Sequence, residues 1–447
     1  MNVLASSDAP PGPVGYPFVG VFPMARRDPL GFFTSCVRRH GDVVTMRLGR
    51  QQVYLLRHPD HVKHVLQDRA PVYAKGPTAS RVRALFGESL TMIDGERWRR
   101  RRRHVQPVFH APRHADFASV ASRACADMLE NWRLVAERGE IVDLVVEMRG
   151  LAQTIIIRAC FGEGAEGERR ALCRALDVAV AHVDRQLWSP IAWLDIPTPL
   201  SAPGRRAIGE IEAYILRATS RARRSGLLPG TLLSALLEFA GEDLSTAEIH
   251  DEIKAFLMAG HTTTASGLAW IWCVLSEHVE ARELIEDECT AVLGSRPPEL
   301  ADLPALAYTR RVIEEVLRLY PPTWLTARSP VENDSLGGYD IPAGALILLS
   351  PYLTHRHPGI WDDPERFDPD RFNQDRSAAR PAFSYFPFGG GPRRCVGSGF
   401  ATAELQMIVA TVVQRFRPTA LPGVRVVPTA GLTLRPSGPM PARILAR

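Results

Sequence analysis

A single long helix near the middle of the sequence constrains the fold more than any other feature. Ser245 and Glu248 form a capping box, in which the two side chains satisfy backbone amides at the helix start. Apolar residues then recur without a proline to about Leu275. At 1.5 Å per residue, these roughly 30 residues make a helix about 45 Å long. A helix of that length must cross the whole molecule.

The middle of this helix departs from helix propensity. Residues 257–264 read Leu-Met-Ala-Gly-His-Thr-Thr-Thr. Glycine disfavours a helix interior because it loses much backbone entropy, and threonine because its hydroxyl competes for backbone hydrogen bonds. A local violation of propensity inside a regular element is typical of a functional site. We therefore predict that this turn lies at one.

The remaining sequence favours one mainly helical domain over residues 1–447. The length exceeds the usual size of a domain, yet no linker, low-complexity block or repeat divides the chain. Hydrophobic residues make up 45%, which is ordinary for a globular protein. The first residues are too polar for a signal peptide, and no run of about 18 apolar residues occurs. We expect a cytoplasmic protein without a membrane anchor.

Seven cysteines at irregular spacings form neither a disulfide framework nor a zinc motif, which indicates a reducing compartment. The last of them, Cys395, ends the string Phe-Gly-Gly-Gly-Pro-Arg-Arg-Cys over residues 388–395. Three glycines and a proline predict a tight loop. Helical spacing from Phe400 to Phe416 predicts a helix that begins at or just after the cysteine. The positive end of a helix favours a thiolate, which serves as a nucleophile or a metal ligand.

The cysteine loop is open to three other interpretations. A nucleophilic cysteine needs a base such as His261, His355 or His357, but that reading leaves the arginines and glycines of the loop without a role. A phosphate-binding loop would require a terminal Lys-Ser/Thr, which is missing. A plain buried cysteine in a glycine-rich turn explains a Cys-x-Gly, but not the whole string.

The string Phe-x-x-Gly-x-Arg-x-Cys-x-Gly over residues 388–397 resembles the haem-binding signature of the cytochromes P450. The resemblance implies a mainly α fold, a triangular helical prism with a smaller β-rich region and a long central I helix. It also implies haem b with Cys395 as the proximal iron ligand. Further roles implied are Arg393 for a haem propionate, Phe388 beside the sulfur, and Gly389 and Gly391 for a flat loop.

The threonine-rich turn of the long helix is similar to the family's oxygen-binding groove. By this resemblance, Ala259 and Gly260 leave room for dioxygen, and Thr263 hydrogen-bonds to the distal oxygen and its water chain. The position of the family's proton-delivering acid holds Thr262 instead. Several groups are alternatives for that role: ordered water, a substrate hydroxyl, or the side chains of His261, Asp251 or Glu252.

The helix expected over residues 311–320 carries Glu315 and Arg318 on one face and is stopped by two prolines. A Glu-x-x-Arg pair is common on protein surfaces. Upstream of the cysteine loop, however, it resembles the family's K-helix motif, which locks with a third arginine and has a structural role. Arg366 and Arg371 compete for the third position, and register from the preceding tryptophan favours Arg371.

The run Arg-Trp-Arg-Arg-Arg-Arg-Arg-His over residues 97–104 is the densest basic segment. No nucleic-acid-binding motif accompanies it, so we expect no nucleic-acid partner. Trp98 and Arg102 share a helix face and resemble the family's C-helix pair that reaches a haem propionate. Arg328 resembles the arginine for the other propionate. The other arginines of the run, Arg99, Arg100, Arg101 and Arg103, are expected to face solvent or a partner.

The resemblance implies a monooxygenase that inserts one oxygen atom from O2 into a hydrophobic small molecule. A terpenoid is preferred, with a polyketide, macrolide or fatty acyl substrate as alternatives, in secondary metabolism. Electrons are expected from NAD(P)H through a ferredoxin reductase and a ferredoxin, and the protein is expected to be a monomer. Other possibilities are a peroxide-using or redox-neutral haem–thiolate enzyme and a non-catalytic haem-binding relative. Residues expected to face the substrate are Leu90, Met92, Phe256, Trp324, Leu325 and Leu432.

Overall fold

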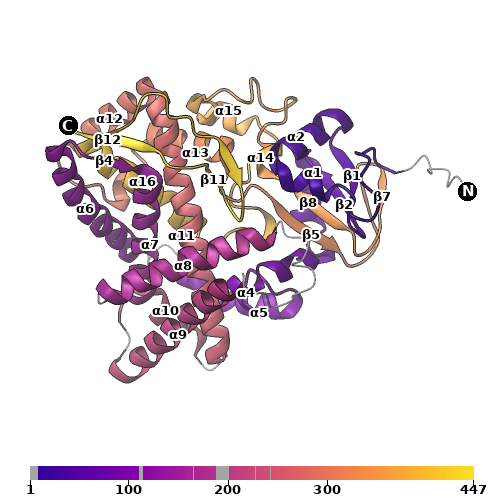
Figure 1. Ribbon diagram of the computed structural model, residues 1–447, viewed down its shortest axis with the longest axis horizontal. Coiled ribbons are helices and arrows are strands. Elements are labelled where there is room, and N and C mark those ends of the chain that lie inside the picture. Colours follow the sequence, from indigo (N-terminus) through magenta and orange to yellow (C-terminus); the bar gives the residue numbers. More distant parts are fainter. Residues whose placement is uncertain (1–8, 110–113, 165, 188–200, 227, 242) are drawn as a thin grey trace, which may run out of the picture. The chain divides into compact units, whose positions relative to one another are not determined.

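The computed structural model describes residues 9–109, 114–164, 166–187, 201–226, 228–241 and 243–447 (Figure 1). The chain forms two compact units, each assembled from separate stretches of sequence. The first unit comprises the chain up to residue 80 with residues 323–367 and 374–395, and the second comprises residues 81–322, 368–373 and 396–447. A single domain over residues 1–447 stays a prediction.

The first unit is built on a five-stranded sheet with the order β1-β2-β8-β5-β3. Strands β2 and β8 pair in parallel, and the other neighbours are antiparallel. Strand β8 (Leu-Ile-Leu-Leu) is buried at every position, as expected for the central strand of a sheet covered on both faces. The bounds are β1 Val43–Leu48, β2 Gln51–Leu56, β3 Tyr73–Ala74, β5 Thr326–Pro330 and β8 Leu346–Leu349.

Short helices and one hairpin complete the first unit. Apolar side chains of α3 and η1, among them Val62 and Leu66, pack with the sheet and with Phe386 in one buried cluster. The hairpin joins β6 (Asp334–Leu336) to β7 (Tyr339–Ile341). The helical segments are α1 Phe22–Arg27, α2 Pro29–His40, α3 Pro59–Lys63, η1 His64–Asp68, η2 Ala70–Val72, α14 Pro351–Thr354, α15 Gln374–Ala378 and η10 Gly391–Arg393, and η3 Pro77–Arg81 ends at the first residue of the second unit.

The second unit is dominated by helices. They enclose a large apolar cluster that includes side chains of α4, α5, α7, α8, α9, α10 and α11. The bounds are α4 Arg83–Phe86, α5 Gly95–Val105, η4 Gln106–Phe109, α6 His114–Arg138, α7 Leu144–Phe161, α8 Glu166–Leu187, α9 Ala202–Ser225, α10 Leu232–Ala240, α11 Thr246–Glu277, α12 Val279–Leu293, η8 Leu300–Asp302, α13 Ala307–Leu319, η9 Pro369–Phe372 and α16 Ser398–Arg415.

Two small sheets also belong to the second unit. One has the order β4-β12-β9, and the other pairs β10 with β11. Their bounds are β4 Ile141–Asp143, β9 Phe416–Ala420, β10 Pro428–Ala430, β11 Leu434–Pro436 and β12 Pro441–Ala446. The sequence predicted a helix that extends to Phe416, but α16 ends at Arg415 and Phe416 is the first residue of β9. Among the helices of the described residues, none is long and apolar enough to cross a membrane.

Helix α11 confirms the long helix predicted from the sequence. It spans 32 residues, and both halves of the Ser245–Glu248 capping box are formed. Helix α7 packs alongside it. A Cβ atom on Gly260 would lie 2.5 Å from Cδ1 of Ile156 on α7, so the Ile156 side chain would have to move to make room for it. Gly260 therefore has a packing role between α7 and α11 that the sequence did not predict.

Candidate active site

The cysteine loop lies in the first unit. The Cys395 amide donates a hydrogen bond to the Phe388 carbonyl at 3.0 Å, which closes the loop. Gly389 and Gly391 both adopt positive φ, +68° and +61°. A Cβ atom on Gly391 would lie 1.8 Å from the Leu66 carbonyl oxygen, so only glycine fits there. The glycines thus hold the backbone of the loop in a conformation that other residues would disrupt.

Cys395 differs from the other six cysteines because its side chain is exposed, whereas theirs are buried or half-buried. Burial raises the pKa of the Cys36 thiol to about 11 and that of Cys125 and Cys273 to about 12. These thiols are therefore protonated near neutral pH. Helix α16 begins three residues after Cys395 in the sequence. The accessible sulfur in its tight loop suits a thiolate ligand.

The other sequence-predicted residues of the first unit differ in burial. Arg328 on β5 is buried, and its guanidinium donates to the Ala327 carbonyl at 2.7 Å. Arg393 in η10 and Phe388 are half-buried. Trp324 is 4% exposed and packs against the Phe33 ring, with ring centroids 6.3 Å apart, while the neighbouring Leu325 is half-buried. Trp324 is therefore also part of the apolar packing of its own unit.

Helix α5 carries the basic run in the second unit. Trp98 and Arg102 are half-buried, Trp98 packs against the apolar cluster, and Arg102 donates to Gln106 at 3.1 Å. The expectation that Arg101 faces solvent or a partner was wrong, because this residue is 1% exposed. Its side of α5 faces α11, where Glu252 supplies the compensating charge at 2.7 Å. Arg99 and Arg103 are exposed, and so is Arg100, which is paired with Glu248.

The threonine-rich turn forms an open face on an otherwise buried helix. Ala259 is exposed, although the seven residues before it are all buried. The hydroxyl of Thr263 donates to the Ala259 carbonyl at 2.7 Å, and that of Thr262 to the Met258 carbonyl at 2.8 Å. Both side chains therefore bond back to the helix, as threonine does in helix interiors. Ala259, Thr262 and Thr263 lie together where a small ligand can approach the helix.

The three side chains considered for proton delivery have other partners in the structure. His261 is buried, its Nδ1 lies 2.7 Å from the Leu257 carbonyl, and burial lowers its pKa. Asp251 accepts the Glu88 amide at 2.9 Å, and Glu252 is buried against Arg101. The carboxylates of Asp251 and Glu252 are therefore both engaged, with the Glu88 amide and the Arg101 guanidinium respectively.

Sequence reasoning missed Glu404 on α16. Its carboxyl is 4% exposed and accepts a hydrogen bond from the Thr264 hydroxyl at 3.2 Å. Burial raises the pKa of Glu404 to about 8, although the Thr264 bond lowers it. The carboxyl of Glu404 therefore holds a proton at neutral pH. It contacts Thr264, which is the residue after Thr263. The position of Glu404 four residues from both Phe400 and Ile408, on the apolar face of a predicted helix, was the available signal.

The structure brings Glu315, Arg318 and Arg371 together. Arg318 binds Glu315 through two hydrogen bonds of 2.6 and 2.8 Å, and Arg371 lies 3.5 Å from the same carboxylate. The Asp368 amide donates to Glu315 at 2.9 Å. All three charged side chains are at most 4% exposed. Helix α13 begins at Ala307, four residues before the predicted start, and ends before Pro321 as predicted.

Four of the residues expected to face the substrate lie in the second unit. Leu90 and Phe256 belong to its buried apolar cluster, and Leu432 packs against that cluster. Met92, two residues after Leu90, is half-buried. Leu432 is held in place by its amide, which donates to Asp184 of α8 at 2.6 Å. Leu90, Phe256 and Leu432 therefore pack with apolar side chains, while the backbone amide of Leu432 binds a carboxylate.

The family model described as Cytochrome P450 matches residues 10–441, nearly the whole chain. The chain belongs to the cytochrome P450 family. It is 35% identical over 436 residues to cyclooctatin synthase of Streptomyces melanosporofaciens, covering 96% of this P450 and 94% of the relative. It is 32% identical over 440 residues to pentalenene oxygenase of Streptomyces avermitilis, covering 97% of each.

A likeness to a solved structure confirms the fold of this P450. The retinoic-acid-bound cyanobacterial CYP120A1 superposes with a TM-score of 0.88 and 24% identity, over 99% of this chain and 100% of the other. The mainly helical P450 fold expected from the sequence is therefore confirmed. This P450 is a monooxygenase, like its relatives named oxygenase and monooxygenase.

Membership of the family implies a haem held by a thiolate. The residues present fit that group on three observations. Cys395 is exposed on a loop whose Gly389 and Gly391 both have positive φ. Guanidinium groups bind carboxylates such as the haem propionates, and the chain offers three of them, on Arg102, Arg328 and Arg393. The exposed face at Ala259 lacks bulky side chains.

Proposed function

We propose that this P450 hydroxylates a terpenoid in secondary metabolism, inserting one oxygen atom of O2 and releasing the other as water. The observation that carries the proposal is the similarity, over nearly the full length, to cyclooctatin synthase and pentalenene oxygenase. The apolar residues Leu90, Phe256 and Leu432 support it, because they offer a terpenoid apolar contact with few polar anchors.

The proposal assigns a role to each of the chain's own residues. Cys395 binds the iron of haem b, Phe388 packs beside its sulfur, and Gly389 and Gly391 keep the loop flat. Haem, when bound, supplies the iron at which dioxygen is activated. The propionates are held by Trp98, Arg102, Arg328 and Arg393. The substrate is contacted by Leu90, Met92, Phe256, Trp324, Leu325 and Leu432.

The open face of α11 orients the oxygen and protons in this proposal. Ala259 leaves space, and the Thr263 hydroxyl donates to oxygen after turning away from the Ala259 carbonyl. Thr262 takes the place of an acid. We expect Thr263→Ala to divert reduced oxygen into hydrogen peroxide, measured as peroxide released per NADPH consumed. Unchanged coupling in this variant would remove Thr263 from the mechanism.

The electrons come, in this proposal, from NAD(P)H through a ferredoxin reductase and a ferredoxin, to a monomeric protein in the cytoplasm. Exposed Arg99 and Arg103 on α5 support this, because exposed cations attract an acidic electron carrier. Arg101 makes no part of that surface, since it is buried. Neutralising Arg99 and Arg103 together is expected to slow reduction and weaken its dependence on salt.

A peroxide-using or redox-neutral haem–thiolate enzyme is the second candidate. Thr262 at the acid position favours this second candidate. Its hydroxyl is hydrogen-bonded to the Met258 carbonyl and, unlike a carboxylate, does not readily take up and release a proton. Such an enzyme would act without ferredoxin. A non-catalytic haem-binding relative is the remaining alternative, and it would stay inert with every electron source.

The first experiment is the ferrous–CO difference spectrum of the purified protein, with Cys395→Ser as the control. A strongly red-shifted Soret band that vanishes in the control is the expected result. Absence of haem, or a spectrum typical of histidine ligation, would contradict the proposal.

The second experiment incubates the protein with pentalenene and, separately, with cyclooctat-9-en-7-ol. The second compound is the one in the name of another relative, cyclooctat-9-en-7-ol 5-monooxygenase of Streptomyces melanosporofaciens, which is 35% identical over 433 residues. One arm contains NADPH, ferredoxin reductase and ferredoxin, and the other contains hydrogen peroxide alone. A product heavier by one oxygen atom in the first arm supports the proposal. Product in the peroxide arm alone would favour the second candidate, and no product with either terpenoid would contradict the terpenoid assignment.

A further inference from the structure

Residues 87–93, in the connection between α4 and α5, are irregular, and each of them is buried or half-buried. Ser89 is fully buried, and Leu90 and Ile93 are 8% and 4% exposed. Backbone amides and carbonyls that leave water need hydrogen-bond partners. Within the segment, the Ser89 carbonyl accepts the Met92 amide at 2.8 Å and the Ile93 amide at 3.1 Å, whereas the amides of Glu88 and Leu90 have partners outside it. The partners of this segment therefore decide its conformation.

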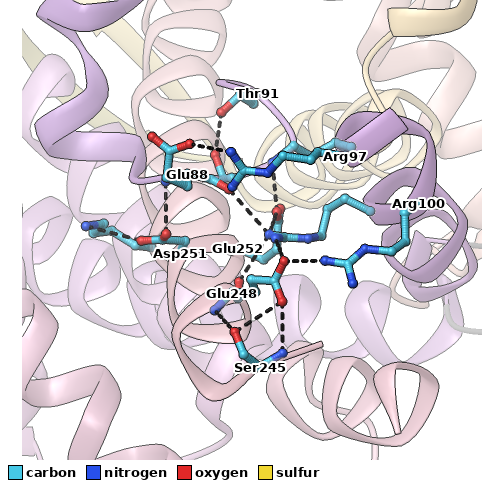
Figure 2. A network of polar contacts seen from close by, with 12 residues as sticks. Glu88, Thr91, Arg97, Arg100, Ser245, Glu248, Asp251 and Glu252 are labelled. Carbon is cyan, nitrogen blue, oxygen red and sulfur yellow. Dashed lines mark hydrogen bonds and ion pairs between the residues drawn. The ribbon is translucent and has the colours of Figure 1, made fainter. Parts of the chain in front are cut away.

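Two neighbouring carboxylates of α11 take backbone amides of this segment (Figure 2). Asp251 accepts the Glu88 amide at 2.9 Å, and Glu252 accepts the Leu90 amide at 2.7 Å. Gly87, just before them, has a φ of +57°. A Cβ atom there would lie 1.9 Å from Oδ1 of Asp251, so the backbone approaches this carboxylate more closely than any side chain permits.

Arg101 of α5 holds the same segment from its carbonyl side. One of its guanidinium nitrogens lies 2.7 Å from Glu252 and 3.4 Å from the carbonyl oxygen of Glu88. Arg101 also binds Glu248, which closes the capping box of α11 and pairs with Arg100 (Figure 2). Hydrogen bonds with an ionised partner are roughly twice as strong as neutral ones. Amides and a carbonyl of one short segment are thus held by charged side chains of two helices.

The held segment carries Leu90 into the apolar cluster that also contains Phe256, with Leu432 and Trp98 packed against it. A shift of the backbone at residue 90 therefore moves an apolar side chain relative to α11. We propose that Asp251, Glu252 and Arg101 are positioning residues that fix segment 87–93 and thereby shape one wall of the substrate site. This inference rests on the proposed function, which places Leu90 and Met92 at the substrate.

The position of the segment is tested by hydrogen exchange in the haem-loaded protein. Glu252→Leu removes the acceptor of the Leu90 amide, and we expect peptides covering residues 87–93 to exchange at least about tenfold faster. Glu252→Gln keeps an acceptor oxygen and is expected to restore much of the protection. Glu277→Gln, an exposed glutamate at the end of the same helix, is the matched control and is expected to leave exchange unchanged.

Gly87→Ala disturbs the same contact without removing a buried charge, which guards against a Glu252 variant that fails to fold. Its added methyl group must displace Asp251, so exchange of residues 87–93 is expected to rise here too. Gly95→Ala is its control: Gly95 has a φ of +61° but open space around the Cβ position. Equal exchange in the two alanine variants, or unchanged exchange in Glu252→Leu, would overturn the proposal.

The shape of the site is tested with imidazole and 4-phenylimidazole, which bind haem iron without needing a known substrate. The phenyl ring reports on the pocket wall, whereas imidazole alone reports on the iron. We expect Glu252→Leu and Gly87→Ala to change the ratio of the two dissociation constants at least about fivefold, with that of imidazole unchanged. An unchanged ratio alongside faster exchange would overturn the specificity role.

The outcomes distinguish this proposal from a proton-carrying role of Glu252 and from failure of the proposed function. A proton-carrying Glu252 would instead raise peroxide release in Glu252→Leu without altering exchange or the affinity ratio, which would contradict a positioning role. Absence of haem from the wild-type protein would contradict the proposed function. Unchanged exchange in a haem-loaded Glu252→Leu variant would contradict this inference alone.

Discussion

Two buried ionic networks of the second unit have similar composition but different architecture. In the α13 network, Glu315 receives Arg318 from its own helix, Arg371 of η9 and the Asp368 amide. In the α5–α11 network, Arg101 joins Glu248 and Glu252 of α11 to the backbone of segment 87–93. The first network connects regular elements, whereas the second holds an irregular segment.

The different architectures of the two networks imply different roles. Removing one partner of a fully buried carboxylate between two arginines destabilises the chain as a whole, because it leaves a charge without compensation. A network that ends on the amides of a loop also controls local conformation, because those amides are the first to open when it weakens. We therefore expect variants in the first network to lower global stability, and variants in the second to act mostly on segment 87–93.

The largest expected effect comes from Glu315→Ala. This change leaves Arg318 and Arg371 buried without their carboxylate, which should lower the free energy of unfolding by about 3–5 kcal/mol. Urea unfolding followed by circular dichroism measures it. Glu314→Ala is the control, because Glu314 pairs with a 60% exposed Arg310 and should cost less than about 1 kcal/mol. Similar losses in both variants would contradict a special role for the α13 network.

The next effect concerns Glu404, a buried carboxyl whose described partner is a hydroxyl rather than an arginine. Burial raises its pKa from 4.5 to about 8, so between these values the folded chain holds a proton that unfolding releases. Stability should therefore fall as pH rises through this window and level off above it. Glu404→Gln removes this contribution.

The measurement is urea unfolding of wild type and Glu404→Gln at pH 6 and pH 8. The stability of the variant relative to wild type should increase by on the order of 2 kcal/mol between these pH values, since each unit of pH contributes about 1.4 kcal/mol. A constant difference between the two proteins would show that Glu404 is ionised in the folded state at both pH values.

Arg101→Met should cost about 2 kcal/mol at pH 8, less than Glu315→Ala, because Glu252 can take up a proton. Burial raises the pKa of Glu252 to about 7 even though Arg101 lowers it. Without Arg101 the pKa rises further, so the destabilisation should be smaller at pH 6 than at pH 8. Thermal unfolding at the two pH values measures this. A cost independent of pH would mean that the two networks behave alike.

The smallest effect is expected for Arg100→Ala. Arg100 shares Glu248 with Arg101 but is 46% exposed, so solvent screens its ion pair. The expected loss is under about 1 kcal/mol, with unchanged hydrogen exchange in residues 87–93. A loss equal to that of Arg101→Met would show that the outer arginine of the α5–α11 network is as important as the buried one.

The two networks also mark what the sequence predicts and what it leaves open. The α13 network follows from local spacing and a motif register, so Arg371 was correctly preferred to Arg366 as the partner that meets Glu315. Five consecutive arginines point all round a helix, and spacing alone does not say which one faces inward. The partner of Arg101, Glu252, lies 151 residues further along the chain. Such a pairing depends on tertiary packing, to which local patterns are blind.

Local sequence signals predicted the ends of helices correctly where a single physical rule determines them. The capping box placed the start of α11, and two prolines placed the end of α13. Gly260 was predicted from its effect on the helix interior, but its contact with Ile156 requires knowledge of where α7 packs. Glu404 was missed because a single acid within an apolar helical face is recognised only when its burial is known.

The contrast among the cysteines has a practical consequence for handling this protein. Reagents such as iodoacetamide attack thiolates, and the buried thiols stay protonated and out of reach at neutral pH. Alkylation should therefore be most extensive at Cys395 in molecules whose sulfur is not bound to iron, and weaker at half-buried Cys173. The alkylated fraction of the Cys395 peptide, measured by mass after proteolysis, then gives the fraction of a preparation that has lost its cofactor, without any activity assay.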